Sequence, residues 1–278
     1  MILEYKIEHD NILSLELKEL LSRHLYKSIK AHKSPIYVNG VETKLYQEVK
    51  KGDTLKIDYE VQSEINWPLY ESHLEVLYED DNYLVVNKKR NLLSIPTNKE
   101  PRSLYQEILY YLSLKNKKPV VSILTRLDKK TSGLCLVALN KVAADKMAPI
   151  HEHIVRKYYA LLKGSLENDE GVIETFIKKD ENSIKRYVSD SGQKAISYYK
   201  VIKRFDDKTL VEFKLETGRT HQIRVHSLYI SHPVIGDDLY TDDEGDLYLT
   251  SHYIKFENMD GKIVEIDIDS WWSNEGEK

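Results

Sequence analysis

Cysteine is nearly absent from this chain, which has a single one, Cys135, among 278 residues. One thiol cannot form an internal disulfide or a zinc cluster, and its place in the apolar stretch LCLVAL predicts a small buried side chain rather than a catalytic nucleophile. The histidines do not form the H-E-x-x-H pattern of a zinc enzyme. We therefore expect no disulfide, no catalytic thiol and no metal.

Long apolar runs and nucleotide-binding motifs are missing as well. No stretch of roughly 18 apolar residues occurs, so no membrane span is expected. The N-terminal segment MILEYKIEHD lacks the basic start and apolar stretch of a secretory signal. Neither G-x-x-x-x-G-K-[ST] nor G-x-G-x-x-G is present, which argues against the common nucleotide-binding folds. These absences predict a cytoplasmic protein without a membrane partner.

A net excess of basic residues is also lacking, because the formal charge is −4. A nucleic-acid partner normally requires a basic surface. The acidic residues are concentrated near the C-terminus, however, since residues 241–278 hold 3 Lys against 11 Asp and Glu, whereas residues 16–51 hold eight Lys or Arg against four Glu. The charge distribution is therefore compatible with an RNA partner, although charge runs are most often solvated faces.

The pattern of residues 1–62 predicts a small α+β unit. Four leucines between residues 17 and 25 recur at helical spacing, and residues 28–33 suit a second short helix, so two helices are expected to open the chain. Asn39-Gly40 between strand-like flanks indicates a two-residue hairpin, and a strand-like segment starts at Thr54. The polar residues 63–73 are the expected linker.

Residues 74–278 are expected to form one larger domain in which strands dominate. The expected strands include LEVLY and YLVVNK, which turn at residues 80–82, and VVSIL, LCLVAL, YYALLK, AISYYKVI, LVEFKL and IVEIDI. The expected helices are LYQEILYYL, which a capping box of Ser103 and Gln106 precedes, NKVAADKM and THQIRVHSLYI. Few strands alternate with long helices, so the predicted fold class is α+β, with an antiparallel-rich mixed sheet and peripheral helices.

Two stretches far apart in the chain carry candidate chemistry. RLDKKTSG spans residues 126–133, and TGRTHQIRVH spans residues 217–226. An acid followed by Thr, Ser and Gly suits any tight turn, so the first stretch is uninformative alone. In the structural interpretation, Asp128 caps a turn and Arg224 is an exposed helix residue.

Together with RKYYALLKG and GDDLY, these stretches resemble the RluA family of pseudouridine synthases over about residues 74–267. The resemblance implies the catalytic domain of that family, no cofactor, and three catalytic residues, Asp128, Tyr158 and Arg224. The chain departs from the family at Thr125, where members usually have His, and at Lys89, where they have Pro.

The pattern of residues 1–62, with V-N-G and K-x-G-D, is similar to the S4 RNA-binding domain that many members carry. The alternative is a small module that packs on the main domain and contacts no RNA. The resemblance to S4 favours ribosomal RNA as the substrate over transfer RNA, by analogy alone. A different class of function is a ribosome-assembly or RNA-binding protein that keeps the fold without catalysis, which the intact catalytic residues argue against. We expect a monomer.

Pseudouridine formation requires an ionised carboxylate near the ribose, to attack C1′ or to remove a proton from C2′. The sequence does not decide between these two acts for Asp128. A carboxylate beside apolar walls stays ionised only if a cation is close, and the predicted cation is Arg224, held to Asp128 by two parallel hydrogen bonds.

The expected contacts with the substrate come from four further positions. The resemblance assigns the uracil-facing ring to Tyr158; in a strand, Tyr159 must then point to the opposite face. A uridine in an RNA helix must be flipped out before it reacts, and Arg126 is the residue expected to brace that arrangement. Arg219 and His221 are the other expected RNA-binding residues.

Overall fold

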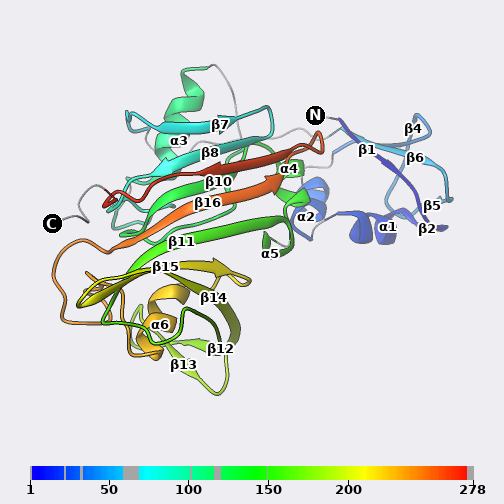
Figure 1. Ribbon diagram of the computed structural model, residues 1–278. Coiled ribbons are helices and arrows are strands. Elements are labelled where there is room, and N and C mark those ends of the chain that lie inside the picture. Colours follow the sequence, from blue (N-terminus) through cyan, green and yellow to red (C-terminus); the bar gives the residue numbers. More distant parts are fainter. Residues whose placement is uncertain are drawn as a thin grey trace.

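The computed structural model describes residues 2–21, 23–31, 34–58, 69–100, 102–115, 120–148 and 150–273. Its strands form a four-stranded and a two-stranded sheet within residues 2–58 and an eleven-stranded sheet within residues 75–267. Figure 1 shows the N-terminal unit, in blue, at one end of the large sheet. Among the described residues, no helix has the length and apolar character needed to cross a membrane.

The N-terminal unit begins with a strand. Its elements are β1 (Ile2–Lys6), β2 (Asn11–Ile12), α1 (Leu13–Leu20), α2 (Arg23–Ala31), β3 (Ile36–Val38), β4 (Val41–Glu42), β5 (Glu48–Val49) and β6 (Thr54–Asp58). The expectation that two helices open the chain is wrong, because β1 precedes them and pairs antiparallel with β6, far along the chain. The second helix also starts earlier than predicted, at Arg23.

The predicted hairpin at Asn39-Gly40 is confirmed. Val38 pairs with Val41, and Asn39 and Gly40 have φ values of 49° and 82°, the left-handed conformation that a type I′ turn requires. The Asn39 side chain accepts a hydrogen bond from the Thr54 N–H at 2.9 Å, so the turn is also tied to β6.

The N-terminal unit has its own buried core, which includes Leu13 and Leu17 of α1 and Leu55 and Ile57 of β6. Val142, from the rest of the chain, packs against this core. The predicted boundary near residue 62 and the first part of the predicted linker, residues 63–68, lie outside the described residues. The division into two domains therefore stays a prediction.

The large sheet has the strand order β13-β12-β14-β15-β11-β16-β10-β8-β7, with β17 paired to β16 and β9 to β10. The strands are β7 (Glu75–Glu79), β8 (Tyr83–Lys88), β9 (Ser122–Ile123), β10 (Ser132–Ala138), β11 (Ile154–Lys163), β12 (Glu170–Lys179), β13 (Arg186–Ser189), β14 (Gln193–Arg204), β15 (Lys208–Leu215), β16 (Leu249–Glu257) and β17 (Ile263–Asp267). The paired strands are antiparallel apart from β10 and β16, which are parallel. The predicted antiparallel-rich mixed sheet is confirmed.

Both faces of the central strands are buried. The helices are α3 (Leu104–Ser113), α4 (Lys141–Lys146), α5 (Ile150–His153) and α6 (Gln222–Tyr229). Cys135 and Val137 of β10 share a core with α3, whereas Leu134 and Leu136, pointing the other way, share a core with α4. This double burial explains why LCLVAL is apolar throughout rather than alternating. Cys135 is buried, as predicted.

The capping box predicted for α3 does not form. The helix starts at Leu104 as expected, but the Ser103 hydroxyl donates to the Gln106 side chain at 2.7 Å instead of accepting from the backbone. A side-chain cap does occur on α4, where the side-chain oxygen Oδ1 of Asn140 accepts from the Ala143 N–H at 2.8 Å. The sequence pattern therefore predicted the helices better than it predicted the hydrogen bonds that cap them.

Candidate active site

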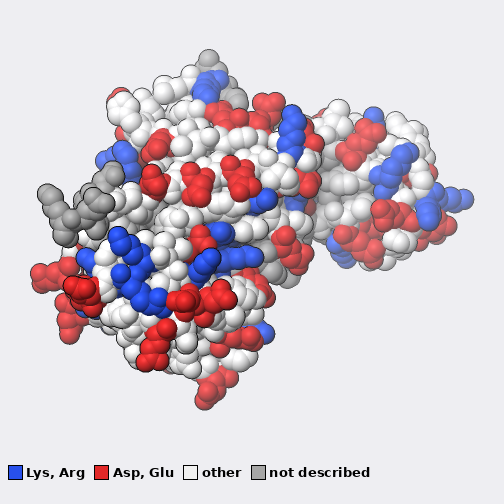
Figure 2. All heavy atoms as spheres, viewed as in Figure 1, with Lys and Arg blue, Asp and Glu red and all other residues white. Residues whose placement is uncertain are grey.

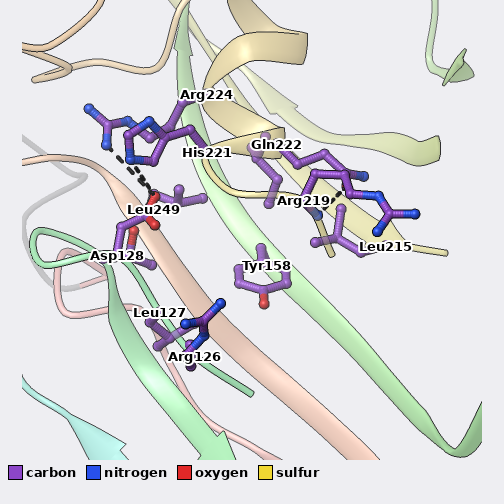
Figure 3. Close-up of a pocket in the computed structure, with 12 residues that line it drawn as sticks. Arg126, Leu127, Asp128, Tyr158, Leu215, Arg219, His221, Gln222, Arg224 and Leu249 are labelled. Atoms are coloured by element: carbon purple, nitrogen blue, oxygen red, sulfur yellow. Dashed lines mark hydrogen bonds and ion pairs between the residues drawn. The ribbon is translucent and has the colours of Figure 1, made fainter. Parts of the chain in front are cut away.

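The three predicted catalytic residues come from three separate elements and line one cleft. Asp128 lies in the loop before β10, Tyr158 on β11 and Arg224 on α6. Figure 3 shows Arg224 and His221 directed at Asp128, with Tyr158 on β11. The cavity volume is about 60 Å³, several times the roughly 10–15 Å³ that one water molecule needs on the same measure. The cleft can therefore admit a group larger than a water molecule.

The loop that carries Asp128 is held by hydrogen bonds on both sides. The Ser94 hydroxyl donates to the Leu127 carbonyl at 2.7 Å and accepts from the Leu127 N–H at 3.0 Å. The Thr131 N–H donates to the Asp128 carbonyl at 3.2 Å, which closes the turn. Asp128 thus sits on a loop of defined geometry, with its side chain 27% exposed.

Lys88 supports the same loop from the core. Its side chain is fully buried and its ammonium group donates to the backbone carbonyls of Lys89, Leu92 and Lys129. Burial lowers the pKa of Lys88 to about 8, against smaller opposing contributions from acidic neighbours that include Asp128. The Lys88 side chain therefore holds the loop in place by binding backbone carbonyls.

Thr125, one of the departures from the family pattern, has a structural role here. Its hydroxyl accepts a hydrogen bond from the Leu136 N–H at 2.7 Å, which fastens the start of the loop to β10. Gly133, at the other end of the motif, has φ 108°, and a Cβ there would lie 2.2 Å from the Ser251 carbonyl oxygen. Glycine is therefore required where β10 meets its parallel partner β16.

Arg224 is bound to a different carboxylate from the one predicted. Its Nε and Nη2 donate to the two Asp237 oxygens at 2.8 and 2.5 Å, whereas its Nη1 lies 3.7 Å from Asp128 Oδ2. The prediction of two parallel hydrogen bonds to Asp128 is therefore wrong, although the charge is close to Asp128. Burial alone would lower the pKa of Arg224, but the hydrogen bond and charge of Asp237, helped by Asp128, raise it.

Tyr158 and Tyr159 point to opposite faces of the sheet, as the strand alternation predicts. Tyr158 lines the cleft and is 6% exposed. Tyr159 instead stacks on His252, with ring centroids 3.6 Å apart. Burial raises the pKa of Tyr158, against the nearby charge of Arg156 which lowers it, so the phenol is protonated at neutral pH.

His221 lies deeper in the cleft than its predicted role in RNA binding suggests. It is the residue before α6, with φ 58°, and its Nε2 is 3.9 Å from Asp128 Oδ2. Burial lowers the pKa of His221, and the charges of Arg224 and Arg186 lower it further, while Asp128 and Asp237 act in the opposite direction. The lowered pKa therefore favours the neutral imidazole at pH 7.

Arg126 and Arg219 both line the cleft, and Figure 3 shows them on different sides of Tyr158. Arg126 is exposed to solvent. Arg219 is half-buried, and its Nε donates to the Lys194 carbonyl at 2.8 Å. Their roles in RNA binding stay predictions.

Two residues of the site were not assigned a role from the sequence, although both belong to the GDDLY stretch. Asp237 anchors Arg224, and Tyr240 lies under it, with the guanidinium carbon 5.2 Å from the ring centroid. The available signal was an acid and an aromatic residue in a short stretch that follows the arginine helix. Thr131 is a third addition, because its buried hydroxyl lines the cleft and has no hydrogen-bond partner among the described residues.

Side chains spaced to hold a metal occur at one place in the described ranges, at His9, Glu16 and Glu19 in the N-terminal unit. Glu16 is already engaged there, since it accepts hydrogen bonds from the Glu8 N–H and the Asn11 side chain.

The cleft contains a different set of groups, a carboxylate with an arginine, a neutral histidine and a phenol. This set suits proton transfer and charge stabilisation at a sugar and a base.

Solved structures with a similar fold include the human RNA Pseudouridylate Synthase Domain Containing 1, with a TM-score of 0.61 and 24% identity over 73% of this chain and 86% of that one. The human RNA Pseudouridylate Synthase Domain Containing 4 matches with a TM-score of 0.58 and 21% identity over 70% of this chain and 88% of that one. At these identities the likeness concerns the fold.

Curated relatives are more similar in sequence to this chain than the two solved structures are. The RNA pseudouridylate synthase family matches residues 82–229. The uncharacterized RNA pseudouridine synthase YjbO of Bacillus subtilis is 35% identical over 79% of this chain and 80% of its own length. Ribosomal large subunit pseudouridine synthase D of Haemophilus ducreyi is 33% identical over 74% of this chain and 64% of its own length. The chain therefore belongs to the RluA family of RNA pseudouridine synthases.

Proposed function

We propose that this enzyme isomerises flipped uridines in ribosomal RNA, with Asp128 as the catalytic carboxylate. The observation that carries the proposal is the convergence of Arg224 and His221 on one oxygen of Asp128, in a cleft walled by Tyr158. A carboxylate, a fixed cation and a planar apolar surface are the groups that the isomerisation requires.

Asp128 begins the reaction at the ribose. Either its oxygen attacks C1′ or it removes the proton from C2′, and in both cases the N1–C1′ bond breaks and its electron pair leaves with the uracil. The base then turns and C5 bonds to C1′. After attack at C1′, the bond between the Asp128 oxygen and C1′ breaks in this step; after deprotonation, the proton returns from Asp128 to C2′. Finally the C5 proton is lost and N1 gains a proton. The atoms and electrons of substrate and product balance, so no oxidant or added group is consumed.

Arg224 acts on Asp128 through its charge. At about 4 Å and an effective dielectric constant of about 20, two unit charges attract by about 4 kcal/mol. Part of that attraction is already satisfied by Asp237, which makes the closer contacts. Arg224 therefore places a positive charge beside the Asp128 carboxylate without closing that carboxylate off from the substrate.

Tyr158 supplies the surface for the base. Its ring lies in the cleft wall, and an aromatic ring stacks on a pyrimidine with little dependence on sequence. Its phenol is protonated because burial raises its pKa, so it can take part in moving the C5 proton only as a donor or through a hydrogen-bonded relay.

Arg126 and Arg219 assist the RNA at the cleft. A flipped nucleotide leaves a gap in its helix and brings its phosphates to the rim of the cleft. Arg126 is exposed and is suited to brace the gap, while Arg219 is steadied by Lys194 and presents its remaining N–H groups to the RNA backbone.

Ribosomal RNA is preferred as the substrate class because several curated relatives are named for the ribosomal large subunit. The N-terminal unit contributes affinity through exposed lysines, such as Lys27 and Lys30 on α2 and Lys50 and Lys51 beside β5. Figure 2 shows basic and acidic side chains interspersed on this unit, and a band of basic side chains over β11 and β15. Local basic areas of this kind bind phosphates despite the net charge.

The central test uses unmodified transcripts of large-subunit ribosomal RNA and of transfer RNAs, with pseudouridine mapped by its carbodiimide adducts. The wild-type enzyme is expected to modify the ribosomal transcript, and Asp128→Asn to leave it unmodified. Asp260→Asn, an exposed aspartate in the turn between β16 and β17, is the matched control. Modification of transfer RNA alone would overturn the substrate class, and full activity of Asp128→Asn would overturn the catalytic assignment.

The N-terminal contribution is tested by the salt dependence of RNA binding. Lys27→Gln together with Lys30→Gln is expected to weaken binding and to lower the slope of log K against log salt by about one for each phosphate that the unit no longer binds. Lys262→Gln, exposed outside the N-terminal unit in the turn between β16 and β17, is the control. Equal slopes for the double variant and the control would favour a packing role for this unit.

A further inference from the structure

Tyr240 joins His221 to the backbone of β13. The Arg186 N–H donates to Tyr240 Oη at 2.8 Å, and Tyr240 Oη lies 2.8 Å from His221 Nδ1. The ring of Tyr240 also meets His221 edge to face, with centroids 5.7 Å apart. His221 is thus held by a residue that is itself fixed in position by a strand.

The direction of these hydrogen bonds follows from the donors available. The Arg186 backbone N–H can only donate, so Tyr240 Oη accepts it. Burial raises the pKa of Tyr240, so the phenol keeps its proton. Among the described residues, His221 Nδ1 is the acceptor in reach of that proton, and a half-buried hydroxyl without an acceptor would be costly.

We propose that Tyr240 fixes His221 as the Nε2–H tautomer, so that a neutral imidazole presents a hydrogen-bond donor to Asp128 Oδ2. A neutral ring has one N–H, and the nitrogen that accepts from Tyr240 cannot carry it. The Nε2–H then faces Asp128 Oδ2 at 3.9 Å. This is about 1 Å longer than a formed hydrogen bond, and such contacts in catalytic sites often tighten when the substrate binds.

The charges around His221 favour this neutral donor. Arg224 and Arg186 face it as cations, and Asp128 and Asp237 as anions. A second full positive charge beside Arg224 would be repelled, whereas a neutral N–H adds a donor without that cost. The left-handed backbone at His221, which histidine tolerates better than most residues, aims the ring into the cleft.

The contacts of His221 and Arg224 also indicate which oxygen of Asp128 reacts, an inference that rests on the proposed function. Arg224 Nη1 and His221 Nε2 both approach Oδ2, at 3.7 and 3.9 Å. For both residues, the ion-pair contact with Asp128 is made to Oδ2. Oδ1 is therefore the oxygen that meets the ribose, and His221 is a positioning residue that holds the carboxylate in that orientation.

The tautomer is measured by NMR on the full-length protein with ¹⁵N-labelled histidine, through two-bond nitrogen–proton correlations at pH 7.5. The His221 signals are assigned by their loss in His221→Gln. We expect the Nε2–H pattern in the wild type, and a mixed or Nδ1–H pattern in Tyr240→Phe, which keeps the ring but lacks the hydroxyl. Tyr198→Phe, which removes an exposed hydroxyl bonded to Glu216, is the control and should leave the pattern unchanged.

Turnover supplies the second readout. Tyr240→Phe is expected to lower kcat by about tenfold with little change in KM for RNA, and His221→Gln, which keeps an N–H donor, to retain more activity than His221→Leu. An Nδ1–H or doubly protonated His221 in the wild type, or an unchanged pattern in Tyr240→Phe, would falsify the proposal. The wild-type measurement needs only the assignment variant, His221→Gln, to fold. An enzyme that is inactive on every RNA but shows Nε2–H would overturn the proposed function and leave the tautomer standing.

Discussion

Two aspartates on separate loops lie beside Arg224, and the two loops hold their carboxylates differently. Asp237 is 1% exposed and binds the guanidinium through two hydrogen bonds, the longer at 2.8 Å. Asp128 is 27% exposed and lies 3.7 Å from the same guanidinium. One carboxylate anchors the arginine, and the other stays accessible in the cleft.

The loops differ in their supports as well. The Asp237 loop turns tightly at Gly236, where a Cβ would lie 1.8 Å from the Asp246 carbonyl oxygen. The Asp128 loop is fastened through its backbone by Ser94 and Lys88, which leaves its side chain free. An arginine satisfied by a buried partner can supply charge to a second carboxylate without immobilising it. We therefore expect substitution of Asp128 to lower mainly the activity, and substitution of Asp237 to lower mainly the stability.

The largest effect is expected at Asp128. Asp128→Asn removes the ionised oxygen pair and should slow pseudouridine formation by about 1,000-fold or more, a loss of about 4 kcal/mol in transition-state stabilisation. Because Asp128 is partly exposed and makes no short ion pair, the midpoint of thermal unfolding should stay close to that of the wild type. Single-turnover assays and calorimetry check both parts. A large loss of stability would mean that Asp128 is also an anchor.

Asp237→Ala should show its main effect on stability. It leaves the buried Arg224 without its closest partner, and removing one member of a buried pair typically costs about 3–5 kcal/mol. Denaturant unfolding measures the change. Asp238→Ala, next to it in the sequence, is the control because its carboxylate is about half exposed and pairs with Lys130. Equal costs for the two variants would remove the distinction between anchor and reactive carboxylate.

Lys88 makes the support of the Asp128 loop depend on pH. Burial lowers its pKa from 10.5 to about 8, so between these values the unfolded chain binds more protons than the folded protein. The stability contribution of this group should therefore rise with pH across about 8 to 10.5, by about 3 kcal/mol in total. Urea unfolding at several pH values measures it. Lys88→Met should flatten this rise, and a rise that persists in the variant would assign it to other groups.

Arg224→Lys should have the smallest effect of the four. Lysine keeps the charge but cannot make two parallel hydrogen bonds to Asp237, so it loses its fixed position near Asp128. The loss of one charge-assisted hydrogen bond, about 1.5–3 kcal/mol, corresponds to a rate decrease of about 10- to 100-fold. Arg90→Lys, at a half-exposed ion pair with Asp246, is the control. Wild-type rates for Arg224→Lys would show that charge alone suffices.

Local patterns predicted the features that local physics decides. Asn39-Gly40 forms a hairpin because both residues tolerate left-handed backbone angles. Tyr158 and Tyr159 face opposite ways because a strand alternates its side chains. In contrast, β1 was missed because its partner β6 lies far along the chain, and β16 was not singled out for the same reason, since it pairs with the distant strands β10 and β11.

The sequence by itself determined the class of fold, the family through its motifs, and the identity of the acid, the arginine and the tyrosine that meet in the cleft. Only the tertiary structure decided how they meet. Two aspartates lie near Arg224. The hydrogen-bonded ion pair forms with Asp237, because Asp237 is closer and more deeply buried than Asp128, and a buried guanidinium is stable only with such a partner. That choice depends on distances and solvent exposure across the fold, which no stretch of sequence encodes alone.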